Sequence, residues 1–365
     1  MKQKAHAWVA LRALKLVDDS EMENTDSLIQ LLMFYLSDIW DGAWLPDTLI
    51  RDMSYGHIFK MDSSDRFVSD ISSQDFRHVS YNELKSETMG KRLCLENYLE
   101  ESEELEKPYW VANRGGKLPD RVIALNHMII DMLKMGDFPL AFYIKKQTPD
   151  EYMDYLTKKK IKDLSSSPNF SARQIALTFF MVSHYICDAH MPLHCDLRDM
   201  FSETVDNGIK ERRLPKSLHP GIEAVWEKSF RSKSRFTIHK YTKESVEKIT
   251  TDMPKNSLIE IDKDPEYRLS TDLYKSMPNE WDEMVNICRI SYAVSRKWIP
   301  KSFAEIKSIL GEKKCKKDAP PLKYEDIIEI IGEDEFKSVT NQIFHDAVES
   351  VARLWYRAWD IFARK

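Results

Sequence analysis

The stretch TFFMVSHYICDAHMPLH, residues 178–194, decides how the rest of the sequence is interpreted. His184 and Asp188 are four residues apart, so a helix places them on the same face, one turn from each other. That face is otherwise apolar, which indicates a core-facing stripe with an imidazole and a carboxylate set into it. Pro192 ends the helix because it lacks an N–H group and disfavours helical geometry in the residue before it. His194 follows directly after the turn.

The residue types in this stretch are those that bind zinc. A buried carboxylate is costly unless it is paired or binds a metal ion, and zinc accepts imidazole and carboxylate ligands. For a lone His-x3-Asp pattern, a core histidine bonded to a helix-capping aspartate is the more common explanation. A second pair four residues apart, His219 and Glu223 in SLHPGIEAVWE, favours the metal site instead.

Length and composition favour one large helical domain. A rule of about 150 residues per domain suggests two or three domains for 365 residues, but no linker divides the chain. We therefore expect a single all-α domain over residues 1–365. Only ten glycines and few alternating β-branched runs argue against a sandwich or barrel. Two charge-rich stretches, 62–110 and 196–217, are predicted to be exposed insertions.

Hydrophobic periodicity predicts helices through most of the chain. Ser171 and Gln174 form a capping box that opens the central helix. The other expected helices cover residues 5–17, 28–39, 91–105, 121–136, 149–161, 221–230, 243–251, 279–296, 301–310, 323–331 and 334–364. Residues 235–242 are the best strand candidate. The sequence contains no repeat and no glycine-rich phosphate loop.

Charge and hydropathy limit the partners and the location. A net charge of −5 gives no general attraction to polyanions, so we expect no stable nucleic-acid complex. No stretch of about 18 apolar residues is present, which predicts no transmembrane segment. The first seventeen residues are not a secretory signal, because charged residues interrupt any apolar core. The sequence is typical of a cytoplasmic protein, removal of a leader stays open as an alternative, and no feature predicts an oligomeric state.

The cysteines do not indicate a disulfide framework. Five are present, an odd number, and none has CxxC spacing. Cys187 and Cys195 flank the metal-binding candidates and have the softness to act as ligands, but small buried fillers are the commoner role for such cysteines.

Histidines and acids form an ordered series along the chain. Eight side chains are possible ligands: His6, Asp47, His57, His184, Asp188, His194, His219 and Glu223. Each has an ordinary structural explanation by itself, and Asp41 and Asp52 compete with Asp47. Eight ligands are too many for one tetrahedral ion, whereas two or three zinc ions that share a carboxylate would use them all.

This series resembles one superfamily, that of bacterial zinc-dependent phospholipase C and the fungal single-strand-specific nucleases. The similar elements span residues 6–223 and occur in order: His6 in an N-terminal helix, Asp47 in GAWLPD, His57 in YGHIFK, His-x3-Asp-x5-His at 184, 188 and 194, and His-x3-Glu at 219 and 223. The resemblance implies the all-α fold of that superfamily, with irregular insertions.

The resemblance also implies how the ions would share the ligands. One ion would bind Asp47, His57, His184 and Asp188, a second would bind His194, His219 and Glu223, and a third would bind His6 and the other oxygen of Asp188. In this superfamily the third ion also binds the N-terminal amine, usually of a tryptophan. Here Met1 lies five residues before His6, as in the fungal nucleases, so its amine is expected to substitute. A site with two ions stays open.

The function that the resemblance implies is a zinc-dependent phosphoesterase. Its substrate would be a phosphate ester, and the sequence leaves open a phosphodiester of a nucleic acid, a nucleotide or a phospholipid head group. A metal-activated hydroxide would attack phosphorus while the ions neutralise charge on the phosphoryl oxygens. Asp47 would also orient or deprotonate the nucleophile. Arg51, one turn beyond Asp47, is either a phosphate ligand or an exposed surface residue.

Two other functions are compatible with parts of the pattern. A phosphohydrolase of the HD type needs an adjacent His-Asp pair among its ligands, and His345-Asp346 in the last helix is the one such pair in the sequence. A helical scaffold with structural or lost metal sites is the non-enzyme alternative. Structural zinc sites close all four positions and favour cysteine, whereas this series mixes histidines with carboxylates.

Overall fold

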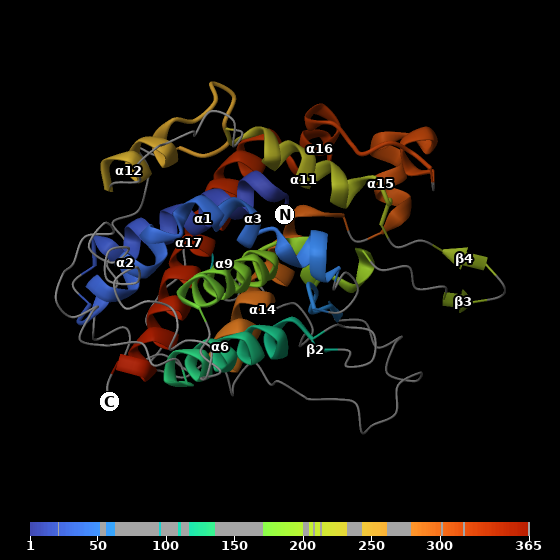
Figure 1. The fold of residues 1–365 in the computed structure, drawn as a ribbon. Helices are drawn as coiled ribbons and strands as arrows, with labels where there is room; N and C mark the ends of the chain where they lie inside the picture. Colours follow the sequence, from blue (N-terminus) through green and yellow to red (C-terminus); the bar gives the residue numbers. More distant parts are fainter. Residues whose placement is uncertain are drawn as a thin grey trace.

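Helix α9 (Ala172–Ala189) carries the central sequence and lies in the middle of the helical packing (Figure 1). It begins at a capping box in which the side chains of Ser171 and Gln174 each accept from the other residue's backbone N–H. It ends before Pro192, and Met191 is already extended, as a following proline requires. The predicted helix and its two end signals are therefore confirmed.

The structure is a computed structural model of the whole chain. It describes residues 1–20, 22–51, 56–62, 95, 109–110, 117–135, 171–199, 204–206, 209–211, 214–231, 243–260, 279–300, 302–316 and 318–363. The predicted helices at 91–105 and 149–161, the predicted strand at 235–242 and most of the predicted insertion 62–110 lie outside these residues.

The described part of the chain is almost entirely helical, so the all-α prediction is confirmed. The longer helices are α1 (Gln3–Asp18), α2 (Thr25–Phe34), α6 (Leu118–Met135), α11 (Leu218–Lys228), α12 (Lys243–Thr251), α14 (Glu280–Trp298), α15 (Phe303–Leu310), α16 (Tyr324–Ile331) and α17 (Glu333–Ala363). Short turns of helix cover Leu36–Asp38, α3 (Ile39–Gly42), the π-helical Pro46–Ile50, α10 (Pro192–Cys195), Leu197–Asp199 and Glu312–Cys315. Each expected helix within the described residues is present, with ends shifted by a few residues.

Two short antiparallel strand pairs accompany the helices. Strand β1 (Met61–Asp62) pairs with β2 (Tyr109–Trp110), and β3 (Thr204–Asp206) pairs with β4 (Ile209–Glu211). Among the helices that the structure describes, none has both the length and the apolar character that crossing a membrane requires.

Helices α1, α6, α14 and α17 surround α9 and bury its apolar side chains in one core (Figure 1). Phe179 and Phe180 are fully buried, and both rings contact Trp355 of α17. The indole N–H of Trp355 donates to the carbonyl of Phe179, which satisfies its polar atom. Burial of each such ring stabilises the fold by roughly 1.5–3 kcal/mol, so α9 is a firmly held support for its polar residues.

The prediction that 196–217 is an exposed insertion is wrong at both ends. Asp196, Arg198 and Leu214 are buried. The Arg198 guanidinium binds the Asp196 carboxylate at 2.7 Å and also donates to the carbonyl of Pro300 at 2.9 Å. Charged residues in sequence indicate a solvated loop, but here the two charges neutralise each other and enter the interior as a pair.

Candidate metal centre

The site is built outward from the polar turn of α9. His184 and Asp188 are both buried, and His184 Nε2 lies 3.1 Å from Asp188 Oδ2. The Nδ1–H of His184 donates to the carbonyl of Ala43 at 2.8 Å. This bond fixes Nδ1 as a donor, so that Nε2 is the nitrogen that faces the cluster, as in histidines that bind metal ions.

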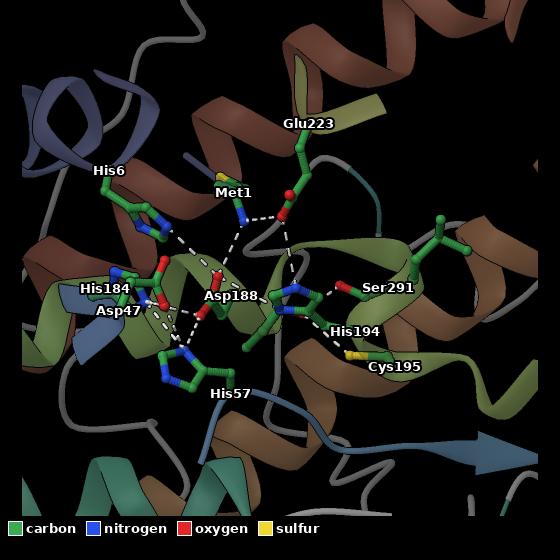
Figure 2. Close-up of polar contacts among 12 residues, drawn as sticks. Met1, His6, Asp47, His57, His184, Asp188, His194, Cys195, Glu223 and Ser291 are labelled. Carbon is green, nitrogen blue, oxygen red and sulfur yellow. Dashed lines mark hydrogen bonds and ion pairs between the residues drawn. The ribbon is translucent and has the colours of Figure 1, made fainter. Parts of the chain in front are cut away.

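The two carboxylate oxygens of Asp188 face different groups of residues (Figure 2). Oδ2 lies 2.7 Å from His57 Nδ1 and 3.1 Å from His184 Nε2. Oδ1 lies 3.5 Å from His194 Nδ1 and 3.6 Å from His6 Nε2. One carboxylate therefore joins two sets of imidazoles, which is the arrangement that a shared ligand requires.

The first group consists of Asp47, His57 and His184, whose ligand atoms lie within 4.8 Å of one another. Asp47 comes from the π-helical turn Pro46–Ile50, and its Oδ1 is 3.6 Å from His184 Nε2 and 3.8 Å from His57 Nδ1. The two imidazole nitrogens are 3.1 Å apart. These separations suit ligands at about 2.0–2.2 Å from one zinc ion.

A local pairing places His57 beside the segment that carries His194. The backbone N–H of Phe59 donates to the carbonyl of His194 at 3.1 Å, and Met61 forms a parallel bridge with Asp196. The buried Lys60 between them donates to the carbonyl of Leu193. These bonds fix the register of the two segments, although they are more than 130 residues apart in the chain.

The second group consists of His194, His219 and Glu223. Helix α11 places His219 and Glu223 one turn apart, with His219 Nε2 3.5 Å from Glu223 Oε1. His194 Nε2 is 3.8 Å from the same oxygen. Behind His219, Nδ1 donates to Asp199 Oδ2 at 2.9 Å.

The third group joins His6 to His184 and Asp188. The His6 and His184 rings are stacked, with centroids 3.9 Å apart. Helix α1 brings His6 here because its first turn is capped by Glu227 of α11, whose carboxylate accepts from the N–H groups of Lys4 and Ala5. The nitrogen of Met1 lies 3.2 Å from Asp188 Oδ1 and 2.9 Å from Glu223 Oε1.

Several buried nitrogens in this cluster have no hydrogen-bond partner. They are His6 Nδ1 and Nε2, His57 Nε2, His194 Nδ1 and His219 Nε2. An unsatisfied buried polar atom costs about 1–3 kcal/mol, and so many at one place call for an explanation. His6 Nε2, His194 Nδ1 and His219 Nε2 face the cluster carboxylates, and lone pairs directed at a metal ion would account for them. The residues therefore fit a metal centre.

The electrostatics of the cluster follow from burial among charges. Burial lowers the pKa of His184, but neighbouring carboxylates, above all Asp188, outweigh it and raise the pKa to about 9. Burial also lowers the pKa of His219, and Asp199 with Glu223 raises it to about 9. Both imidazoles thus hold a second proton at neutral pH, which a metal ion has to displace.

The pKa values of three other buried groups are lowered. Burial, the largest effect, holds the pKa of His6 and of His194 well below the usual value, so both are neutral. Burial would raise the pKa of Asp188, but the Met1 amine and His184 outweigh it and hold that pKa well below its usual range. The centre thus presents ionised carboxylates and, at His6 and His194, neutral imidazoles, which are the protonation states that bind metal ions, whereas His184 and His219 first have to lose a proton.

Three of the ligands are partly exposed to solvent. The side chains of Asp47, His219 and Glu223 are 24%, 21% and 17% exposed, whereas those of His6, His184 and Asp188 are at most 2% exposed. A substrate would therefore approach along Asp47, His219 and Glu223, and any coordination position left open by the protein would lie there.

The structure brings together all eight predicted ligands, but other candidates lie elsewhere. Arg51 is exposed, and its Nε donates to the carbonyl of Thr48 instead of pointing into the cluster. Asp346 accepts from the backbone N–H of Leu95, and neither His345 nor Asp346 belongs to a metal group found among the described residues. The same three groups contain no cysteine, and both Cys187 and Cys195 are buried and free.

Sequence reasoning missed Lys60 and Asp199, which support the ligands from behind. Lys60 follows His57 closely in YGHIFK, and Asp199 lies in the segment predicted to be exposed. No local pattern distinguishes them from solvated charges. A clue was available for Asp199, because a carboxylate is the common second partner of a histidine ligand.

Comparison with family models, with curated proteins and with solved structures found no match to this chain. What can be said of its chemistry therefore depends on its own residues, which form three groups of histidines and carboxylates capable of holding metal ions.

Proposed function

We propose that this protein is a zinc-dependent phosphoesterase with the fold of the phospholipase C and single-strand-specific nuclease superfamily. One observation carries the proposal: the two oxygens of Asp188 face separate sets of imidazoles, within a cluster in which some ligands are partly exposed. Imidazole with carboxylate suits zinc, and two or three ions would use the whole set.

The chain's own residues divide into holding and orienting roles. His184 and His57 with Asp47 and one oxygen of Asp188 would hold one ion, His194 and His219 with Glu223 a second, and His6 with the other oxygen of Asp188 a third. Bound zinc would supply a hydroxide nucleophile at neutral pH and positive charge for the phosphoryl oxygens. Asp47, whose side chain is 24% exposed, would accept a proton from the attacking water.

The alternatives are supported less well by the same geometry. A phosphohydrolase of the HD type would need His345 and Asp346 among its ligands, and Asp346 instead accepts a bond from Leu95. A scaffold with structural zinc would have little reason to leave Asp47, His219 and Glu223 partly exposed, because structural sites close all four positions.

The test is metal analysis followed by hydrolysis of a phosphoester panel that contains single-stranded DNA, a nucleotide and a phosphodiester of a phospholipid head group. We expect about two to three zinc ions per chain, from the ligand count. His184→Ala and Asp188→Ala should lose bound zinc and at least about 100-fold in activity, as loss of a metal ligand weakens both binding and water activation.

His190→Ala is the matched control, because His190 is a buried histidine at the end of the same helix whose Nε2 bonds Ser350 and no cluster residue. It should keep its zinc and its activity. Normal hydrolysis by the His184 or Asp188 variant would contradict the proposal, and loss of activity in an Asp346→Ala variant with intact zinc would favour the HD-type alternative.

A further inference from the structure

A buried ion pair behind the second metal group has no role in the chemistry proposed above. Lys60 is only 2% exposed, and its Nζ lies 3.0 Å from Asp199 Oδ2. The same nitrogen donates to the carbonyl of Leu193, the residue before His194. Asp199 Oδ2 also accepts the Nδ1–H of His219 at 2.9 Å. One lysine and one aspartate therefore connect the segments that carry two of the three ligands.

Stability alone gives this pair little reason to exist. Removing two charges from water costs several kcal/mol per ion in proteins, and their attraction seldom does more than offset that cost. Lys60 also donates a second hydrogen bond, to a backbone carbonyl and not to another carboxylate. We therefore look for a geometric role. The contacts of the pair fix the position of His194 relative to His219.

The chemistry of an imidazole ligand indicates what that geometry does. A neutral imidazole has one N–H and one lone pair, so a carboxylate that accepts from Nδ1 directs the lone pair of Nε2 away from itself. For His219 that direction leads to Glu223 Oε1, 3.5 Å away in the metal group. His219 Nε2 has no hydrogen-bond partner in the fold, so this nitrogen is available to a metal ion.

We propose that Asp199 is a positioning residue, which holds His219 in the tautomer and orientation that a metal ion needs, and that Lys60 fixes Asp199 to the His194 segment. The inference deepens the proposed function and rests on its metal site, although not on its substrate. Carboxylates behind histidine ligands typically contribute about 10–100-fold to metal affinity.

Competition for zinc against a chromophoric chelator tests the proposal, with the full chain as wild type, Asp199→Ala and Asp199→Asn. We expect at least one bound zinc ion to be held about 10–100-fold more weakly in Asp199→Ala. Asp199→Asn should lose less, because its amide oxygen still accepts from His219 Nδ1. The visible spectrum of the cobalt-substituted protein should also change in Asp199→Ala, because it reports the geometry of the ligands.

Glu283→Gln is the matched control, since Glu283 is a buried carboxylate that pairs with the buried Arg353 away from the metal groups. Its zinc affinity and cobalt spectrum should equal those of wild type, even if it unfolds more easily. Unchanged zinc affinity in both Asp199 variants would overturn the proposal, as would an equal loss in Glu283→Gln. If Asp199→Ala fails to fold, the affinity and spectrum of Asp199→Asn decide.

The two proposals can fail separately. A wild type that binds zinc, loses it in Asp199→Ala and hydrolyses no phosphate ester would support the positioning role and contradict the phosphoesterase. A hydrolytically active wild type with normal zinc affinity after Asp199→Ala would do the reverse.

Discussion

Single residues set which nitrogen of each histidine faces the metal groups. His184 and His219 each donate through Nδ1, to the Ala43 carbonyl and to Asp199, and so present Nε2. His57 is placed the other way, with Nδ1 beside Asp188. For His184 and His219 the partner on the far side of the ring therefore matters as much as the ligand itself, because a wrong tautomer presents an N–H where a lone pair is needed.

Zinc binding should release protons at neutral pH. The pKa values of His184 and His219 are raised to about 9 in the metal-free fold, so both rings are protonated at pH 7 and must lose that proton to bind. We expect these two rings to release about two protons per chain at pH 7 and almost none at pH 10. The apparent zinc affinity should accordingly rise with pH until about 9 and then level off. Calorimetric titration in buffers of different ionisation enthalpy counts the protons.

His184→Ala provides the internal check on that count. The substitution removes one of the two imidazoles with a raised pKa. Zinc that still binds at His219 should therefore release about one proton fewer than in the wild type. A binding enthalpy that does not depend on the buffer at pH 7 would mean that the two rings are already neutral, and the electrostatic description of the cluster would then be wrong.

The spacing in the sequence predicted the ligand pairs on helices because a helix brings residues four positions apart side by side. His184 with Asp188, and His219 with Glu223, are neighbours on any helix, so four-residue spacing was sufficient. Lys60 and Asp199 could not be found this way, since their contact joins residues 139 positions apart. For Arg51 the sequence left two roles open, and the structure shows the exposed residue: it is one turn from Asp47 in sequence, but the π-helical turn ends there and Arg51 has a positive φ of 51°.

Helices α3 and α9 pack closely against each other where they support the metal groups. A Cβ atom added to Gly42 would lie 2.8 Å from Phe180 Cβ, which is closer than such atoms come, and 3.2 Å from Leu177 Cδ2, which is a tight contact. The next residue, Ala43, supplies the carbonyl that binds His184. The glycine was predictable only as a turn residue, because its close approach to α9 depends on the packing of two separate helices.

Gly42→Ala should therefore weaken both the fold and the metal centre. The clash should lower the free energy of unfolding by about 1–3 kcal/mol, as overpacking of a core does. Displacement of the Ala43 carbonyl should also weaken zinc binding by about 10-fold, through loss of the tautomer that it fixes. Urea unfolding of the zinc-free protein and competition with a chelator measure the two effects.

A substitution at a second glycine distinguishes general destabilisation from displacement of the Ala43 carbonyl. Gly332 has a φ of +93° and open space around its Cα, so Gly332→Ala strains the backbone by about 1–3 kcal/mol without touching α9. It should lower stability and leave zinc affinity unchanged. An equal loss of zinc affinity in both variants would show that general destabilisation, and not the Ala43 carbonyl, is responsible.

The whole molecule brings the ligands together from distant parts of the chain. Six segments contribute ligands, and these ligands converge near Asp188 (Figure 2). The segments are α1, the Pro46–Ile50 turn, the segment around His57, α9, α10 and α11. The helices themselves were predicted from periodicity, but their convergence depends on long-range packing around α9. An unfolded chain has no such site, so metal binding and folding are coupled.

Zinc should for that reason stabilise the protein strongly. Linkage gives a gain of about 4 kcal/mol in the free energy of unfolding when free zinc is 1,000 times its dissociation constant. Thermal unfolding with zinc and after chelation measures the gain, and the midpoint should rise with zinc concentration. His184→Ala should lose most of this increment, whereas His190→Ala should keep it. Equal midpoints with and without zinc in the wild type would mean that the clustered side chains hold no ion tightly, because any ion bound only by the native fold must displace the equilibrium toward it.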